Sequence, residues 1–124
     1  MNIKDSGNRE EFDTGAKRDT QTGKGRFDLI PYEALHEIAR CYEAGAEKYD
    51  PRNWEKGIPV SRFMSSALRH MMKAASGYTD EPHLAQAAFN IMGAITTIKR
   101  VEMGQLPAEL DDRPTHRRGY SPPG

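Results

Sequence analysis

Apolar residues recur at helical spacing in three segments of the chain and are sparse elsewhere. The pattern predicts α-helices over residues 31–48, 60–76 and 83–103. Pro31 suits the first turn of a helix, and Gly77 is a stop signal after the second. No segment alternates between apolar and polar residues as a strand does, so we expect no β-sheet.

Each predicted helix has one apolar face that we expect to be buried. The expected buried residues are, in chain order, Leu35, Ile38, Ala39, Tyr42, Ala46, Tyr49, Met64, Ala67, Leu68, Met71, Ala75, Leu84, Ala88, Ile91, Ile95 and Ile98. The opposite face of the second helix is basic, with His70 at one flank.

These elements predict an all-α fold, a small antiparallel helical bundle. Residues 1–28 form an extended N-terminal arm, 29–103 the helical core, and 104–124 an irregular, polar, Pro-rich tail. A core of this size buries a modest share of its surface, so we expect a homo-oligomer to complete it.

Composition narrows the class of protein further. The chain has 124 residues with 18 basic and 18 acidic side chains, and its zero net charge disfavours a nucleic-acid partner. The single cysteine, Cys41, cannot form an internal disulfide, which favours a reducing compartment. No apolar segment is long enough for a membrane span or signal peptide, so the expected location is the cytoplasm.

Two glutamates one helical turn apart are the first metal candidates. Glu33 and Glu37 project side by side, and adjacent carboxylates suit Mg²⁺ or Mn²⁺. Asp80 and Glu81, just before the third helix, could complete the metal shell, and His83 is a further candidate. The alternatives are a solvated helix face for the glutamates, favourable charge at a helix N-terminus for Asp80, and a structural role for His83.

Basic side chains in the arm and on the helices are suited to phosphate. The leading candidates are Lys17, Lys24, Arg26, Lys48 and Arg69, and the same segments also carry Arg18, Arg62 and Lys73. The Gly23-Lys24 pair is followed by Gly25 where a Walker A loop needs Ser or Thr, so no P-loop is present.

A few residues could bound a base and sugar. Trp54 lies in a turn after Asn53, where it could stack on a purine or staple the turn onto the helices. His70, His83 and Asn90 are further candidates for substrate contact.

Six short motifs resemble motifs that the phage and bacterial dATP/dGTP diphosphohydrolases have in the same order. The motifs are residues 15–19, 23–31, 45–49, 52–54, 67–70 and 83–90. The family is similar to the MazG-like all-α nucleoside triphosphate pyrophosphohydrolases, and the similarity is greatest to the MazZ type, from phages that replace adenine with 2-aminoadenine. The MazG-like pattern has E-x-x-E on one helix and E-x-x-D on a later one. In this chain the later predicted helices have Arg69-His70 and residues 83–86 where the second pair of acids would be sought, so the metal ligands cannot be copied from that pattern.

The resemblance implies hydrolysis of dGTP, and possibly of dATP, to the monophosphate and pyrophosphate. In such a phage, dGMP would feed synthesis of the aminoadenine nucleotide. The hypothesis is that Glu33 and Glu37, with Asp80 and His83, hold two or three Mg²⁺ or Mn²⁺ ions that activate water for attack on the α-phosphorus. Glu33→Gln is therefore expected to abolish turnover.

Two alternatives stay open from the sequence. One is a triphosphohydrolase that releases the nucleoside and tripolyphosphate. The other is a non-catalytic helical module that binds nucleotide or a protein.

Overall fold

The computed structural model describes residues 5–114, and the chain divides after Pro31 into two compact units. Within the described residues, no helix is long and apolar enough to span a membrane.

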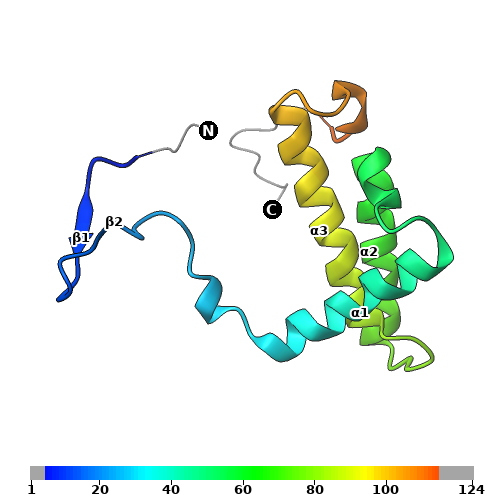
Figure 1. Cartoon of the computed structure of the whole chain (residues 1–124). Coiled ribbons are helices and arrows are strands. Elements are labelled where there is room, and N and C mark those ends of the chain that lie inside the picture. The colour runs from blue at the N-terminus through cyan, green and yellow to red at the C-terminus, as the bar shows by residue number, and fades with distance from the viewer. Residues whose placement is uncertain (1–4, 115–124) are drawn as a thin grey trace, which may run out of the picture. The chain divides into compact units, whose positions relative to one another are not determined.

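The N-terminal unit contains a small antiparallel β-hairpin. Strand β1 (Arg9–Glu11) pairs with β2 (Lys17–Asp19) (Figure 1). The facing pairs are all of opposite charge: Arg9 with Asp19, Glu10 with Arg18, and Glu11 with Lys17. The turn requires Gly15, whose φ of +86° lies in the left-handed region. The expectation of no strands is wrong here, because three-residue strands of charged side chains lack the alternation that marks a strand in sequence.

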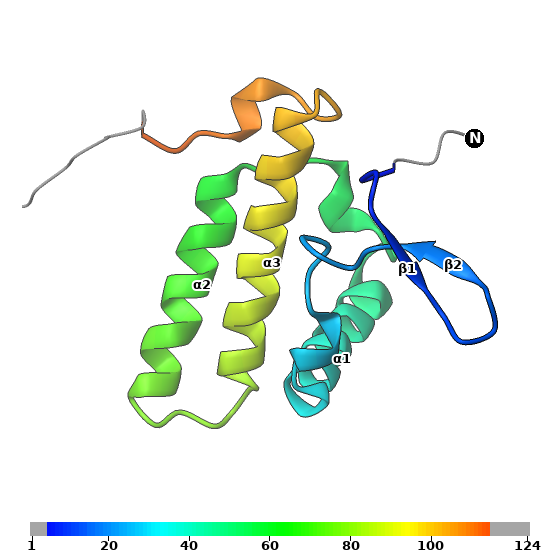
Figure 2. The same ribbon diagram turned by 90° about the vertical axis from the view of Figure 1, so that its left-hand side faces the viewer.

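The C-terminal unit contains the three predicted helices. They are α1 (Tyr32–Lys48), α2 (Val60–Ala75) and α3 (His83–Glu102). Each helix starts and stops within one residue of its predicted range, which confirms the all-α class. Figures 1 and 2 show α2 and α3 side by side as an antiparallel pair, and α1 packs against α3.

The core of this unit is small and centres on the contact between α2 and α3. Val60 and Phe63 from α2 and Ala94 from α3 are buried together. Gly93 allows the helices to approach closely, because a Cβ there would lie 2.5 Å from a carbon of the Phe63 ring. Trp54, in the short 3-10 helix η2 (Asn53–Lys56), packs against the same cluster.

Several apolar residues predicted to be buried are instead exposed in the single chain. On α2 the buried residues include Phe63, Ala67 and His70, while Leu68 is 63 % exposed. The other exposed members of the predicted faces are Leu35, Tyr49, Met64, Met71, Leu84, Ile91 and Ile95, together with Ala39 and Ala75. The buried face of α2 is therefore rotated from the predicted face toward Phe63 and His70, and the two faces share Ala67. Gly93 and Ala94 of α3 leave room for the Phe63 ring between the helices, while Leu68 and the other large apolar residues of the predicted faces named above lie outside.

The first part of the predicted tail is folded onto the helices. A short 3-10 helix, η3 (Ala108–Leu110), contacts α3. Beyond it, the Asp112 carboxylate accepts hydrogen bonds from the Ser61 hydroxyl and, at 2.8 Å, from its backbone N–H. Asp112 therefore satisfies one of the free N–H groups in the first turn of α2. Residues 115–124 of the predicted tail lie outside the described part.

Candidate active site

A groove of about 1110 Å³ lies between α1, η2, α2 and the start of α3. It is large enough to hold a nucleoside triphosphate. Ten residues that the sequence singled out line it: Glu37, Lys48, Asn53, Trp54, Arg62, Arg69, His70, Asp80, Glu81 and Asn90. Tertiary structure therefore gathers metal, phosphate and base candidates from four elements into one place.

Two other lining residues were missed as site candidates. Arg40 adds positive charge, and Gln86 adds a polar group. The sequence did not single them out, since helical periodicity alone does not show which polar face lies over a groove.

The remaining candidates lie elsewhere. Glu33, one turn before Glu37, is exposed and does not line the groove. Lys17, Lys24 and Arg26 belong to the N-terminal unit, whose placement relative to the helices is not defined.

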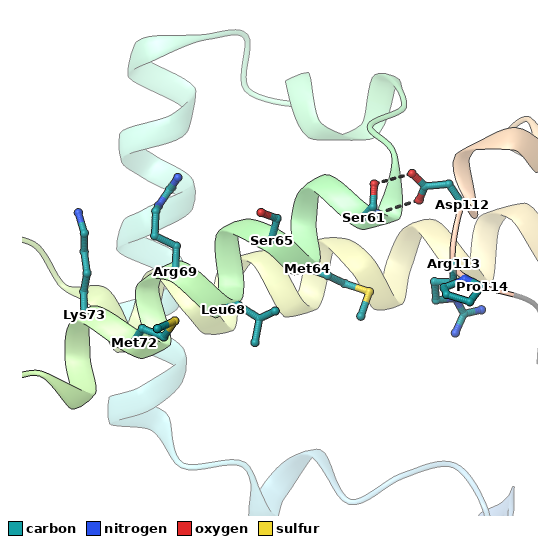
Figure 3. A pocket seen from close by; sticks show the side chains of 10 residues that line it. All are labelled: Ser61, Met64, Ser65, Leu68, Arg69, Met72, Lys73, Asp112, Arg113 and Pro114. Carbon is teal, nitrogen blue, oxygen red and sulfur yellow. Dashed lines mark hydrogen bonds between the residues drawn. The ribbon is translucent and has the colours of Figure 1, made fainter. Parts of the chain in front are cut away.

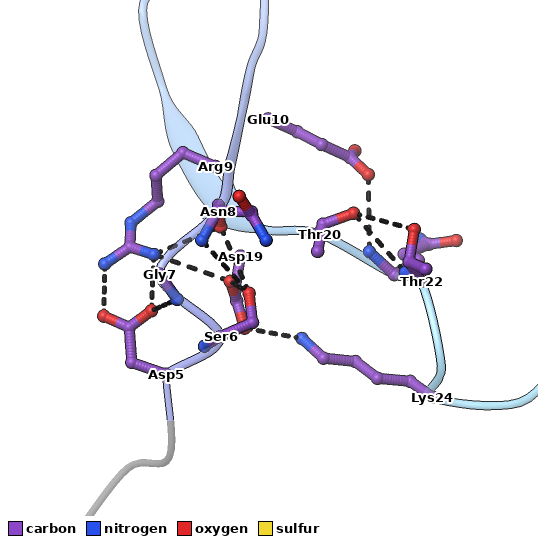
Figure 4. A network of polar contacts seen from close by, with 11 residues as sticks. Asp5, Ser6, Gly7, Asn8, Arg9, Glu10, Asp19, Thr20, Thr22 and Lys24 are labelled. Atoms are coloured by element: carbon purple, nitrogen blue, oxygen red, sulfur yellow. Dashed lines mark hydrogen bonds and ion pairs between the residues drawn. The ribbon is translucent and has the colours of Figure 1, made fainter.

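Charges in the N-terminal unit are paired with one another. Figure 4 shows Asp19 at the centre of a polar network, accepting hydrogen bonds from Ser6 and, at 3.1 Å, from the Lys24 ammonium. The bond from Ser6, together with that from Lys24, holds the pKa of Asp19 well below its usual range. Arg26 forms a bidentate pair with Asp28, at 2.9 and 2.7 Å. To bind phosphate, Lys24 and Arg26 would have to exchange these carboxylates for phosphate oxygens.

Three residues at the start of α3 could hold a metal ion. Asp80, Glu81 and His83 each place one possible ligand atom within 4.8 Å of the others. A hydrogen bond with His83 lowers the pKa of Asp80, and one from Gln86 lowers the pKa of Glu81, so both are carboxylates at neutral pH. Glu37 of α1 lines the same two cavities as these two acids, which places three carboxylates at their boundary.

His83 is already engaged through both ring nitrogens. Its Nε2 lies 2.8 Å from Asp80 Oδ1 and its Nδ1 lies 2.9 Å from Nδ1 of His70. Ligation by His83 would require one of these hydrogen bonds to break, so the carboxylates are the better ligand candidates. Burial, reinforced by the nearby charge of Arg69, lowers the pKa of His70. The two histidines are thirteen residues apart on different helices, and the sequence carried no signal of their contact.

Aromatic side chains form another wall of the groove. Tyr42 contacts Phe89 edge to face, with ring centroids 4.6 Å apart, and Trp54 at 6.0 Å. The Arg100 guanidinium lies over the Trp54 ring at 5.3 Å. Trp54 thus staples its turn onto the helices, one of the two roles considered for it.

The cavity in Figure 3 has a different character. It runs along the outer side of α2 and is lined by Met64, Leu68 and Met72. Asp112 is its single carboxylate among the described residues, and it is hydrogen-bonded to Ser61. This cavity therefore lacks the acids that a metal-bound triphosphate needs.

Comparison with known proteins identifies the chain's family. The model of the family described as "dATP/dGTP diphosphohydrolase, N-terminal" matches residues 14–106, which include all three helices and the groove. No curated protein and no solved structure matches the chain. The sequence resemblance is thus confirmed over most of the chain, and the protein belongs to the dATP/dGTP diphosphohydrolase family.

Proposed function

We propose that this protein hydrolyses purine deoxynucleoside triphosphates, dGTP and dATP, to the monophosphate and pyrophosphate. One observation carries the proposal: a single groove presents carboxylates, cationic side chains and aromatic rings together. A divalent ion, a triphosphate and a purine require these three kinds of group. The substrates named in the family's description supply the choice of nucleotide.

Glu37, Asp80 and Glu81 are the proposed metal ligands. Their carboxylate oxygens suit Mg²⁺ or Mn²⁺, and two of the three have lowered pKa values. Divalent ions bound there would lower the pKa of a coordinated water and neutralise charge on the triphosphate. Glu33 was predicted from the sequence as a metal ligand, and it remains a candidate although its side chain would have to reach the ions from outside the groove.

Four cationic residues that line the groove are the proposed phosphate ligands. They are Arg40, Lys48, Arg62 and Arg69. The arginines offer forked N–H donors that match phosphate oxygens, and they stabilise charge on the departing pyrophosphate. Lys17, Lys24 and Arg26 would join them if the N-terminal unit closes over the substrate.

The base and sugar are assigned to the aromatic end of the groove. Asn53 and Asn90 offer amide groups there, and Trp54 and Phe89 offer ring surface. The side chain of Asn90 is partly committed, since its Nδ2 donates to the Gln86 carbonyl at 2.8 Å. In a phage that makes 2-aminoadenine, the dGMP produced would enter synthesis of that nucleotide.

The proposed active form is a homo-oligomer. The exposed Met64, Leu68 and Met71 follow the spacing of a helical seam along α2, as Leu84, Ile91 and Ile95 do along α3. Helical geometry places both seams on one side of the α2–α3 pair, away from the groove. A second copy packed there would bury apolar surface that one chain leaves in water.

Phosphorus NMR tests the reaction directly. The purified protein is incubated with dGTP or dATP and Mn²⁺, and with a chelator as the control. Metal-dependent pyrophosphate and monophosphate are expected. Tripolyphosphate would indicate a triphosphohydrolase instead. Intact triphosphate in every sample would contradict hydrolysis and favour the non-catalytic binding module.

A further inference from the structure

Two buried histidines from different helices touch through the same kind of ring nitrogen. His70 of α2 is 9 % exposed and His83, the first residue of α3, is 2 % exposed. Their Nδ1 atoms lie 2.9 Å apart, a hydrogen-bond distance. Two bare lone pairs would repel at this distance and two N–H groups would clash, so one proton lies between the nitrogens.

Asp80 determines which histidine donates that proton. Its carboxylate can only accept, so His83 Nε2, 2.8 Å away, carries a hydrogen and donates it. In the neutral ring of His83, Nδ1 then has a lone pair and accepts. His70 therefore donates from its Nδ1, and in the neutral ring its Nε2 is left with a lone pair.

His70 is one of the residues that line the proposed active-site groove, together with Asp80, Glu81 and Arg69. Among residues 5–114, no side chain or backbone group is hydrogen-bonded to His70 Nε2. A residue of the groove thus has an uncommitted lone pair, and the same groove is lined by the proposed metal ligands.

We propose that Asp80 and His83 fix His70 in its Nδ1–H tautomer, and that His70 Nε2 accepts a hydrogen bond from the water that attacks the triphosphate. His70 is then a catalytic residue, and His83 is a positioning residue that acts through it. In many active sites a carboxylate orients a histidine through a hydrogen bond. Here Asp80 orients His83, and His83 in turn orients His70. The inference rests on the proposed hydrolysis.

The tautomer can be measured without substrate or metal. Long-range ¹H–¹⁵N correlation spectra of the full chain distinguish protonated from bare ring nitrogens, and the His70→Gln and His83→Phe variants assign the signals. The expected result near neutral pH is a protonated Nδ1 and a bare Nε2 in His70. A protonated Nε2 with a bare Nδ1 would overturn the inference. In His83→Phe, where the lock is lost, the share of His70 with a bare Nε2 should fall.

Steady-state kinetics tests the role of the nitrogen. His70→Gln and His83→Phe should each lower kcat about 10- to 100-fold while KM for dGTP changes far less. His36→Gln is the control, because His36 is exposed and stacks only on Tyr32, at 5.8 Å. Circular dichroism establishes that each variant is folded.

The kinetic outcomes separate the possible failures. Unchanged kcat in both folded variants, or a loss confined to KM, would overturn the role in orienting water. A wild-type protein that hydrolyses no nucleotide would instead contradict the proposed function, and the tautomer measurement would still stand by itself.

Discussion

Glu33 and Glu37 stand one helical turn apart on α1, yet only Glu37 lines the groove. We predict that Glu37→Gln lowers kcat by about 100-fold or more, because it removes a charged oxygen ligand next to Asp80 and Glu81. Pyrophosphate release at saturating dGTP and Mn²⁺ measures the effect.

Two glutamates of the same helix serve as comparisons for that variant. Glu43→Gln is the matched control, since Glu43 is exposed and lies outside the groove. Glu33→Gln should have a smaller effect than Glu37→Gln. The reverse order would contradict the choice of Glu37 over Glu33 as a metal ligand.

Gly93 is a residue whose importance lies in packing. A Cβ at this position would lie 2.5–2.9 Å from three carbons of the Phe63 ring. Gly93→Ala should therefore lower the free energy of unfolding by about 1–3 kcal/mol, as other overpacked cores do. Urea denaturation followed by circular dichroism measures the change.

Gly45 provides the control for Gly93. It lies inside α1, and a Cβ there would meet nothing within 4 Å. Gly45→Ala should raise the free energy of unfolding by roughly 0.5–1 kcal/mol, because alanine restricts the unfolded chain and favours helix. Equal effects of the two substitutions would contradict the close approach of α2 and α3.

At the scale of elements, the N-terminal unit is the segment whose role in catalysis is open. It carries Lys17, Lys24 and Arg26, and a closing segment that brings cations to a triphosphate would stabilise the charged transition state. We predict that deletion of residues 1–28 lowers kcat/KM for dGTP about 10-fold or more, while the helical content of the remaining chain persists.

Point variants separate charge from simple truncation. Lys24→Ala combined with Arg26→Ala should reproduce part of the loss, while Gln21→Ala in the same unit should not. Unchanged kinetics after the deletion would show that the unit is not a lid.

At the scale of the whole molecule, the exposed apolar seams predict self-association. The wild-type chain should have a solution mass above the 13.9 kDa of one copy. Leu68→Glu combined with Ile91→Glu should shift the mass toward the monomer, since a buried unpaired carboxylate opposes association. Light scattering after size-exclusion chromatography measures both masses.

The control for association adds charge elsewhere. Gln21→Glu introduces a carboxylate on an exposed loop of the N-terminal unit and should leave the mass unchanged. A wild-type protein that is monomeric at micromolar concentration would contradict the assembly, and the apolar face would need another explanation.

The sequence by itself determined the helices, because their signals are local. Helical periodicity, with proline and glycine at the boundaries, located α1, α2 and α3 to within a residue. Short sequence motifs also indicated the family, since they are spread over most of the region that the family model matches. The hairpin of β1 and β2 was not predicted, because short strands that pair through charged residues show no alternation of apolar and polar positions.

Only the tertiary structure decided which faces of the helices meet and what they bring together. Periodicity placed residues such as Leu68 and Ile91 inside, but in the structure they are exposed, and Phe63 packs between the helices against Gly93. The tertiary structure also places Glu37 rather than Glu33 in the groove and brings His70 into contact with His83. Contacts between helices depend on side-chain volume and on the angle at which the helices meet. The spacing of apolar residues along one helix does not determine how these two factors combine.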